Sequence, residues 1–409
     1  MKKIISILLT AMIVFSLVGC TKKETAKEEE PKANWEEALI KAKGSTVNFY
    51  GWGGSEFTNN WIDNVLAKKV KEDYDITLKR VPMDIENILN KMLGEKQANN
   101  ESGTIDLVWI NGENFYTAKK ADLLYGPFAD ILPNFNKYID EKSPDVTHDF
   151  GYEVEGYEVP YGKAQLVMVY NNEFVKTPPK SAEELMEFCK ANPGKFTYPA
   201  PPDFTGSAFV RNIIYDIVGK EKLDGLETKE EVQKAIQPAI DYLNELKPYL
   251  WSEGKTYPAT IAQLDNMFAD KEVVGTVTYS PNSIDGKIKT GEYPKEAKSA
   301  IFEKGTIGNT HFVAIPFNAS NKEGAMAVAN AILSVEMQST KYDPITWGDL
   351  PVLDNSKLSD EEKSIFDKAK ISDAIVPQDE LLSHRKSEPA AHLIPIIEKI
   401  WLETVAKGD

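Results

Sequence analysis

The sequence predicts an α/β protein of two lobes, with mainly parallel sheets flanked by helices. Short β-rich runs alternate with helical patterns from residue 46 onward, an order that produces parallel sheets with right-handed crossovers. About 370 residues follow an N-terminal export segment, too many for one ordinary core and enough for two. Cys189 is the only cysteine in that part, which excludes a disulfide framework and favours a small buried hydrophobe at this position.

The first 19 residues predict a signal peptide. Lys2 and Lys3 precede an apolar run over 4–18, which is short for a membrane span. The run ends in "LVGC", which resembles the lipobox of bacterial lipoproteins. This resemblance implies that Cys20 takes a diacylglycerol and becomes the new N-terminus; a cleavable signal that merely ends near a cysteine is the alternative. The charged residues up to 44 then predict a flexible tether.

The chain is acidic, with a formal net charge of −16. Cleavage after Gly19 would remove Lys2 and Lys3 and change the net charge to −18. Such a charge argues against a nucleic acid partner and against a polybasic membrane patch. After the export segment, no run of about 18 apolar residues follows, so no second membrane span is expected.

The first half of the fold predicts a β-α-β-α-β order. Strands are expected at 46–52, 75–81 and 104–110, with helices at 59–71 and from 85 onward. In "IENILNKML" the apolar residues mark one helical face: Ile85, Ile88, Leu89, Met92 and Leu93. A parallel sheet with its helices on the outside follows from this order.

The middle of the chain predicts a crossing between the lobes. "GYEVEGYEVPYG" at 151–162 has the character of a hairpin, with Gly156 as a turn residue. Further strands are expected at 165–171, 273–279 and 311–317.

Capping patterns mark helix starts in the second half. Three pairs have the spacing of a capping box: Ser181 with Glu184, Thr228 with Glu231, and Ser320 with Glu323. The helix after 203 is expected to stop at Gly219, and Pro238 is expected to kink or split the next helix. The tail over 360–406 is expected to be mostly helical.

Three loops that follow strands are candidates for ligand contact, because ligands of open α/β sheets lie beyond the carboxyl ends of the strands. Each loop combines small or amide residues with an aromatic ring, which suits a small polar ligand. The candidates are Trp52, Gly53, Gly54 and Ser55 in the first loop, Asn111, Gly112 and Glu113 in the second, and Tyr279 and Ser280 in the third.

A fourth candidate is the start of the helix after 203. Thr205, Gly206 and Ser207 would present backbone amides, which can hold a carboxylate or phosphate, and Arg211 follows one turn later. The alternative is ordinary capping by Thr205 or Ser207, with Arg211 in solvent. Both interpretations stay open, since one residue can do both.

Motifs for cofactors and catalysis are missing from the sequence. "GWGGSEF" is neither a phosphate-binding P-loop nor a dinucleotide-binding fingerprint, and no cofactor is expected. The four histidines (His148, His311, His384 and His392) are far apart or separated by proline, so no metal site is expected. A carboxylate pair for glycoside hydrolysis cannot be judged, because 63 acidic residues always supply some pair.

Three stretches together resemble the extracellular solute-binding proteins of bacterial ABC importers. They are "TVNFYGWGGS", "YEVPYGKAQLVMVYNNEFV", and "MFADKEVVGTVTYSPNS" followed by "THFVAIPFNASNKEGAMAVANAIL". The likeness is to the group that binds iron, thiamine, polyamines and maltodextrins, and within it to the YnjB-like branch. It implies a periplasmic-binding-protein-like fold of class II, with the ligand cleft between the lobes.

The resemblance also implies the division of the chain. The first lobe would comprise 45–158 and 312–342, and the second lobe 163–306 and 346–409. Hinges are expected near Val159–Tyr161 and Ile307–Thr310, which adds Tyr161 and Asn309 to the ligand-binding candidates.

The leading function is a lipid-anchored, monomeric protein that closes around one small solute and delivers it to an ABC permease. Glu56 and Glu113 could balance a positive charge, so a thiamine-like or polyamine-like solute comes first. An anion held by Gly206, Ser207 and Arg211 comes next and a sugar third, while iron ranks low because no adjacent tyrosine pair exists. A lipid-anchored hydrolase of glycan or cell-wall material is the alternative, followed by a sensor or adhesin domain.

Overall fold

The protein is represented by a computed structural model that describes residues 34–407. The predicted signal peptide, Cys20 and most of the predicted tether lie outside these residues. The end of the tether is a correction: helix α1 spans Trp35–Ala42, with Asn34 as its N-cap. This segment is ordered because Ala38 and Ala42 are buried and the Trp35 ring packs edge-on against Tyr74 at 6.4 Å.

The sheet of the first lobe contains the predicted parallel strands. β1 (Thr46–Gly51) lies between β2 (Thr77–Pro82) and β3 (Leu107–Ile110), and both pairs are parallel. β11 (Thr306–Pro316) runs antiparallel to β3 and also pairs with β4 (Leu124–Tyr125). The helices of this lobe are α2 (Glu56–Asn60), a π-helical turn (Trp61–Leu66), α3 (Ala67–Tyr74), α4 (Ile85–Gln97), α5 (Glu113–Lys120), α6 (Pro133–Tyr138), α7 (Pro144–Thr147), α13 (Lys322–Ile332) and α14 (Val335–Tyr342).

The sheet of the second lobe is antiparallel, which corrects the expectation of mainly parallel sheets. Its order is β10 (Ala297–Ala300), β8 (Val167–Asn171), β9 (Gly275–Thr278), and both neighbours run antiparallel to β8. β9 and β10 therefore run parallel to each other across the intervening β8, as expected of strands joined by one crossover helix. The helices are α8 (Ala182–Ala191), α9 (Phe204–Val218), α10 (Lys229–Leu246), α11 (Ile261–Ala269), α12 (Ser283–Thr290), α16 (Gln378–Ser383) and α17 (Ile394–Trp401).

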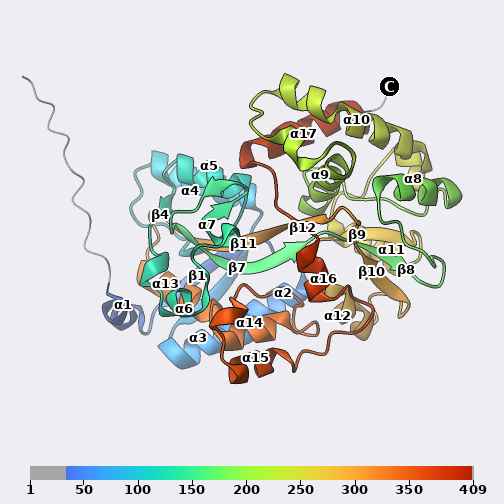
Figure 1. Cartoon of the computed structure of the whole chain (residues 1–409). Coiled ribbons are helices and arrows are strands. Elements are labelled where there is room, and N and C mark those ends of the chain that lie inside the picture. The colour runs from blue at the N-terminus through green and yellow to red at the C-terminus, as the bar shows by residue number, and fades with distance from the viewer. Residues whose placement is uncertain (1–33, 408–409) are drawn as a thin grey trace, which may run out of the picture. The chain divides into compact units, whose positions relative to one another are not determined.

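Two long strands cross between the lobes, as predicted. β7 (Glu158–Gln165) lies beside β11 (Figure 1), and the two pair antiparallel over seven positions with a bulge between His311 and Phe312. Before them comes the short hairpin of β5 (His148–Asp149) and β6 (Tyr152–Glu153). β12 (Arg385–Lys386) pairs with the start of β11.

A third connection contacts the crossing strands. Lys163 and Leu350 exchange backbone hydrogen bonds. Further along, Asp354 donates to the backbone of Tyr138, and the Tyr138 hydroxyl donates to Glu362 in α15 (Asp360–Phe366) at 2.7 Å. The lobe boundaries stay a proposal, and these contacts favour starting the last segment of the second lobe after α15 rather than at 346.

The predicted helix ends are confirmed in part. Ser181 caps α8 and Gly219 ends α9, and Thr228 forms a full capping box with Glu231. One expectation is wrong: Asn321, not Ser320, caps α13, because the Ser320 hydroxyl donates to the Gly103 carbonyl instead. Pro238 lies inside α10 without splitting it, because the helix is continuous over 18 residues and its buried face packs on α9 and α17.

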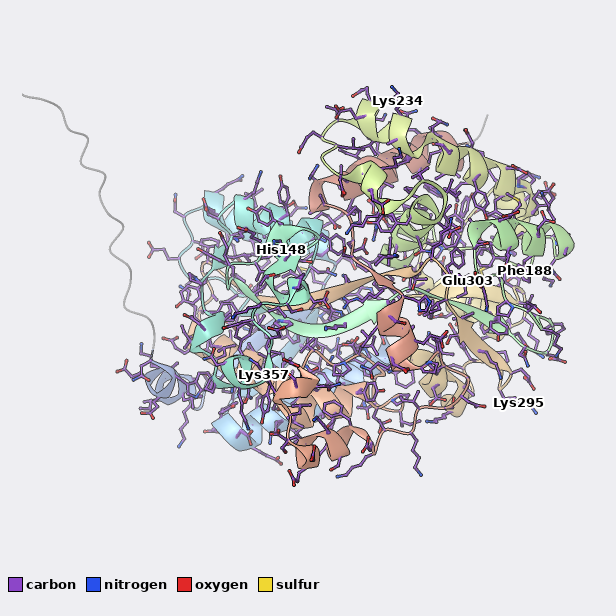
Figure 2. The ribbon with its side chains drawn as sticks, viewed as in Figure 1. His148, Phe188, Lys234, Lys295, Glu303 and Lys357 are labelled. Carbon is purple, nitrogen blue, oxygen red and sulfur yellow. The ribbon has the colours of Figure 1, made fainter. Side chains whose placement is uncertain are left out.

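Each lobe has a hydrophobic core of its own. The larger core belongs to the second lobe and includes Cys189, which is fully buried as expected. The predicted face of α4 is confirmed at Ile88 and Met92, while Leu93 is exposed. Charged side chains such as Lys234, Lys295, Glu303 and Lys357 lie at the surface (Figure 2). Within residues 34–407, no helix is long and apolar enough to cross a membrane.

Short turns complete the chain. The tail is less helical than expected, because the stretch between α15 and α16 and the stretch around β12 contain no α-helix. Single turns of 3-10 helix occupy Ala129–Ile131, Lys220–Leu223, Lys247–Tyr249, Trp251–Gly254, Asn355–Lys357 and Ala391–Leu393, and a π-helical turn occupies Leu402–Ala406.

Candidate functional site

The first loop presents an exposed indole above glycine backbone. Trp52 is 43% exposed, and a Cβ atom on Gly54 would lie 2.3 Å from its Cζ2 atom. Gly54 is therefore required for the indole to lie flat on the backbone. Ser55 caps α2 by accepting from the Thr58 amide at 3.3 Å, and the Gly53 carbonyl accepts from Asn59 at 2.8 Å.

The second loop brings a carboxyl group to the start of α5. Asn111 ends the strand region, and Gly112 has a φ of +61°, a conformation that favours glycine. Its missing Cβ also leaves room for the Phe150 ring, and its amide donates to Asp149 Oδ2. Glu113 follows as the first residue of α5, with Oε2 buried and without a hydrogen-bond partner among the described residues.

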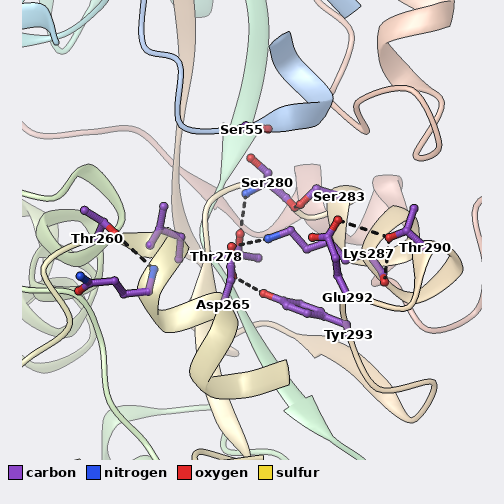
Figure 3. A network of polar contacts seen from close by, with 12 residues as sticks. Ser55, Thr260, Asp265, Thr278, Ser280, Ser283, Lys287, Thr290, Glu292 and Tyr293 are labelled. Carbon is purple, nitrogen blue, oxygen red and sulfur yellow. Dashed lines mark hydrogen bonds and ion pairs between the residues drawn. The ribbon is translucent and has the colours of Figure 1, made fainter. Parts of the chain in front are cut away.

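The third loop lies after β9 and is shown in Figure 3. The Ser280 amide donates to Thr278 Oγ1 at 3.3 Å, and Ser283 Oγ donates to the Ser280 carbonyl at 2.7 Å. Lys287 in α12 is paired with Asp265. Tyr279 points away from this network, because its hydroxyl donates to Glu388 Oε1 at 2.8 Å.

The start of α9 is already capped, and by a residue that the sequence prediction did not name. Asp203 Oδ1 accepts from the amides of Thr205 at 3.0 Å and Gly206 at 3.1 Å. The Ser207 amide donates to the Asp203 carbonyl at 2.8 Å. The expected cap at Thr205 or Ser207 is therefore wrong, since the Asp203 carboxylate lies closer to the first free amides. Gly206 lets the helix approach the Pro199 carbonyl, where a Cβ atom would clash at 1.9 Å.

Arg211 is buried, which corrects the alternative that placed it in solvent. Its side chain is 1% exposed, because Glu388 compensates its charge in a two-point ion pair. Nε donates to Glu388 Oε2 at 2.8 Å and Nη2 donates to Oε1 at 2.9 Å, while Nη1 donates to the Ser207 hydroxyl. Ser207 in turn donates to Glu398 Oε1 at 2.6 Å.

These contacts bring residues of both lobes into one group, the interlobe cluster. Its members are Glu113, Asp149 and Phe150 from the first lobe and Phe204, Ser207, Arg211, Tyr279, Glu388 and Glu398 from the second. The Phe150 ring lies 6.4 Å from Phe204 and 5.9 Å from the guanidinium carbon of Arg211. The Ala391 amide donates to the Phe150 carbonyl at 2.8 Å, so the C-terminal segment also reaches the first lobe here.

The interlobe cluster contains more carboxyl groups than cationic groups. Burial raises the pKa of Glu113 to about 7, against the lowering effect of its own backbone amide and of Arg211; the charges of Glu398 and Glu388 raise it further. Burial also raises the pKa of Asp149 well above its usual range, although the Gly112 amide opposes this. The carboxyl groups of Glu113, Glu388 and Glu398 thus share the single guanidinium of Arg211.

Tyr161 and Asn309 lie on the crossing strands, as predicted. The Tyr161 ring is fully buried, and burial raises the pKa of its hydroxyl well above the usual range. Its ring packs against an aromatic group made of Phe49, Trp61, Trp109, His311 and Trp347. Asn309 is 5% exposed, and both of its amide atoms are unpartnered within the described part of the chain.

His311 belongs to a buried charge group beneath these rings. Asp349 Oδ2 lies 3.0 Å from His311 Nε2 and 2.5 Å from Lys341 Nζ. The Lys341 side chain is fully buried, and burial lowers its pKa in spite of Asp349. This group supports the crossing strands from inside the first lobe.

Several members of the cluster were missed by sequence reasoning. They are Asp149, Phe150, Phe204, Glu388 and Glu398. Glu388 is one acidic residue among 63 and lies in a loop far from Arg211 in sequence. Phe150 carries a hint, because an aromatic before Gly151 in a hairpin can mark a turn, and its φ is +43°.

Two cavities lie away from most predicted residues. One of about 430 Å³ lies on the second lobe, lined by residues of α8, α9 and α10 with Lys304. The other, of about 200 Å³, lies behind the Arg211 ion pair and is lined by Gly151, Glu388 and His392 among others. Contacts across the lobes locate the site better than these cavities, because among the described residues they connect the second loop, Tyr279 and the start of α9. Over residues 34–407, no group of three or more His, Cys, Asp or Glu side chains could hold a metal ion.

Comparisons with known proteins agree with this architecture. A profile of the family described as bacterial extracellular solute-binding protein matches residues 65–370. Protein YnjB of Escherichia coli is 37% identical over 373 residues, which cover 90% of this chain and 93% of YnjB.

Solved structures show the same fold at low identity. A putative spermidine/putrescine ABC transporter from Listeria monocytogenes aligns with a TM-score of 0.61 at 18% identity, covering 88% of this chain and 98% of that chain. A periplasmic thiamin binding protein aligns with a TM-score of 0.61 at 14% identity, covering 88% and 95%. The AfuA protein of Actinobacillus pleuropneumoniae, with fructose-6-phosphate bound, aligns with a TM-score of 0.62 at 14% identity, covering 89% and 99%.

Proposed function

The chain belongs to the bacterial extracellular solute-binding proteins, and from this premise we propose that it captures one small cationic solute between its lobes and delivers it to an ABC permease. Binding would be reversible and would need no covalent step. The two long crossing strands and the two separate cores support a closure mechanism, in which the solute binds the closed arrangement better than the open one.

The charge of the proposed solute rests on one observation: the interlobe cluster has more acceptors than donors. Glu113 Oε2 and Asp149 Oδ1 are buried, and no described residue donates to them. A buried carboxylate oxygen without a partner is costly, so a cation that supplies the missing contact is stabilised strongly. The relatives named for spermidine/putrescine and for thiamin take cationic solutes, which agrees with this proposal.

An anionic solute is less well supported. The amides at the start of α9 that would hold it are engaged by Asp203, and Arg211 is engaged by Glu388 and Ser207. A carboxylate or phosphate would have to displace Glu388 from a two-point ion pair. The sugar phosphate bound by AfuA therefore has no ready counterpart in this cluster.

The ligand-binding set remains the predicted one with the additions from the cluster. Trp52 would wall the site with the exposed part of its indole, while Gly54 supports the ring from behind. Ser55, Ser280 and Asn309 would supply polar contacts near the crossing strands. Tyr161 would hold the aromatic group in place beneath them.

The location proposed for the protein is the outer face of the bacterial membrane. Cys20 would carry the lipid, and the residues before α1 would serve as the tether of a monomeric protein. Cys20→Ser should release the protein from the membrane fraction, as measured by fractionation and immunoblotting. Continued retention of this variant would contradict the lipid anchor without affecting solute binding.

A hydrolase acting on glycans is the weaker alternative, because family and fold are those of solute-binding proteins. It would require measurable turnover of a glycan, whereas a binding protein raises only its melting temperature in the presence of solute. A thermal-shift panel of cationic, neutral and anionic solutes separates these outcomes. We expect only cationic solutes to stabilise the protein, and stabilisation by anions alone would contradict the proposed charge.

Trp52→Ala tests the first loop in the same assay. Because the indole is 43% exposed, we expect little loss of basal melting temperature but loss of the solute-induced shift. An unchanged shift would remove Trp52 from the site.

A further inference from the structure

We propose that the cation of the solute is an ammonium that carries N–H groups, a primary or secondary amine, and that Glu113 and Asp149 bind it directly. This inference rests on the proposed function and sharpens it. It selects amines over quaternary ammonium groups and over N-alkylated aromatic cations such as thiazolium, which also carry positive charge but have no N–H at the charged nitrogen.

The first step is that Asp149 is held in place with one oxygen free. Asp149 is 2% exposed, and its Oδ2 accepts from the Gly112 amide. That contact fixes the orientation of the carboxyl group. Its Oδ1 lacks a donor among residues 34–407. Glu113 directly follows Gly112, the residue bonded to Oδ2, and the charge of Glu113 acts on the pKa of Asp149.

The second step is that Glu113 offers a matching oxygen toward the second lobe. Its Oε1 lies 3.3 Å from Asn114 Nδ2, while Oε2 has no donor in the described structure. Glu113 follows Gly112, which packs against the Phe150 ring, and that ring lies 5.9 Å from the Arg211 guanidinium. Glu113 therefore lies on the side of the first lobe that meets the interlobe cluster, and the charges of Arg211, Glu398 and Glu388 act on its carboxyl.

The third step is that the neighbouring donors point to acceptors of the second lobe. Arg211 directs three of its five N–H groups there, from Nε and Nη2 to Glu388 and from Nη1 to Ser207. The Tyr279 hydroxyl donates to Glu388 as well, and the Ser207 hydroxyl donates to Glu398. No described residue donates to Glu113 Oε2 or Asp149 Oδ1, so a solute that brings N–H groups would supply the missing donors.

The fourth step concerns the aromatic rings of the cluster, which are poorly placed to hold a cation without N–H groups. Such cations bind over ring faces. The guanidinium of Arg211 already lies 5.9 Å from the Phe150 ring, and Phe204 meets Tyr279 edge-on at 5.3 Å. A quaternary nitrogen would also leave both carboxyl oxygens without donors, so amine binding is favoured.

Titration calorimetry at pH 8 tests the inference with matched probes. Putrescine and spermidine supply N–H donors, while the bis(trimethylammonium) analogue of putrescine keeps the charge and spacing without them; thiamine represents an aromatic cation. We expect at least one amine to bind, and the trimethylated analogue to bind roughly ten- to one-hundred-fold more weakly than putrescine.

Variants show whether Glu113 makes the contact. Glu113→Gln should weaken amine binding roughly ten- to one-hundred-fold. Glu158→Gln is the control, because Glu158 is a more deeply buried carboxyl with both oxygens unpartnered in the described chain, and Arg211 and Glu388 do not act on it, although the charge of Asp149 does. It should leave amine affinity within about twofold. If circular dichroism shows that Glu113→Gln is unfolded, Asp149→Asn takes its place.

Several results would overturn the inference. They are equal binding of the trimethylated analogue, equal losses in Glu113→Gln and Glu158→Gln, and failure of every amine to bind. In each case the proposed function survives if another cationic solute of the thermal-shift panel stabilises the protein. Only the absence of stabilisation by every solute class would count against solute binding itself.

Discussion

Arg211 of the second lobe and Glu113 of the first lobe belong to the same interlobe cluster. Other side chains compensate the charge of Arg211, whereas one carboxylate oxygen of Glu113 has no hydrogen-bond donor among the described residues. Arg211 is 1% exposed, and three of its five N–H groups donate to Glu388 and Ser207. Glu113 is held by little more than Asn114, with one oxygen unpartnered in the part of the chain that the structure describes. The difference indicates that the charged groups of the second lobe bind one another and stabilise the fold. The carboxyl group of the first lobe remains available to bind the solute.

This difference also changes the meaning of the sequence motif around Arg211. An arginine near the start of a helix favours an anion site when its donors are free. Here Glu388 compensates the Arg211 charge in a two-point ion pair, and Asp203 accepts from the first amides of α9, so the same residues stabilise the fold instead. Free acceptors, rather than free donors, then determine the charge of the proposed solute.

The largest expected effect comes from breaking the engaged pair. Glu388→Ala leaves the Arg211 charge buried without its partner, so the free energy of unfolding should fall by about 3–5 kcal/mol in urea denaturation. The control is Glu173→Ala, which breaks an exposed pair with Lys271 and should cost less than about 1 kcal/mol. Equal small losses in both variants would contradict the architectural role of the buried pair.

A smaller effect is expected on amine affinity when the pH is changed, because Glu113 titrates in the accessible range. Burial raises its pKa to about 7, Arg211 opposes this, and Glu388, Glu398 and Asp149 carry like charges nearby. An ammonium binds the ionised carboxylate, so affinity should increase by up to about tenfold between pH 6 and pH 8. Calorimetry checks this, and a profile that stays sloped in Glu113→Gln would assign the titration to another group.

The stability of the empty protein should change with pH in the opposite direction. The folded state holds the Glu113 proton up to about pH 7, while the unfolded chain releases it near 4.5. Between these values the folded state binds more protons, so this group lowers the free energy of unfolding as pH rises.

The smallest expected effect shows whether the Glu113 charge stabilises or destabilises the empty protein. At pH 8, Glu113→Gln removes a buried carboxylate that lacks a donor within residues 34–407, so the empty protein should become more stable by about 1 kcal/mol. Urea denaturation measures this change. A loss of several kcal/mol, as expected for Glu388→Ala, would show that Glu113 is a structural charge like its counterpart.

Much of the fold could be predicted from local patterns. Strand β1, helix α4 and the crossing strand β7 follow from hydrophobic periodicity and turn residues, which act over a few neighbouring positions. The antiparallel order around β8 could not be predicted in this way, because the position of β8 between β9 and β10 depends on contacts far apart in sequence. The ordered helix α1 was missed because its charged flank hid the buried positions Ala38 and Ala42.

The loops of the candidate site could be predicted from the sequence, but which of its charged groups remain unpaired could not. Glu113 stood out because it follows a strand, and Arg211 because it lies one turn after the small residues at the start of a helix. Whether either is free depends on Glu388, which reaches Arg211 from 177 residues away. Burial and long-range pairing decide which charge a solute meets, and neither can be seen in a short stretch of sequence.

The most direct test of this account is a crystal structure of the protein with a bound amine that stabilises it in solution. The account predicts the amine nitrogen within about 3 Å of Glu113 Oε2 and Asp149 Oδ1, with Arg211 still paired to Glu388. An anion held by Arg211 at the start of α9, or an amine bound away from both carboxyl groups, would contradict it.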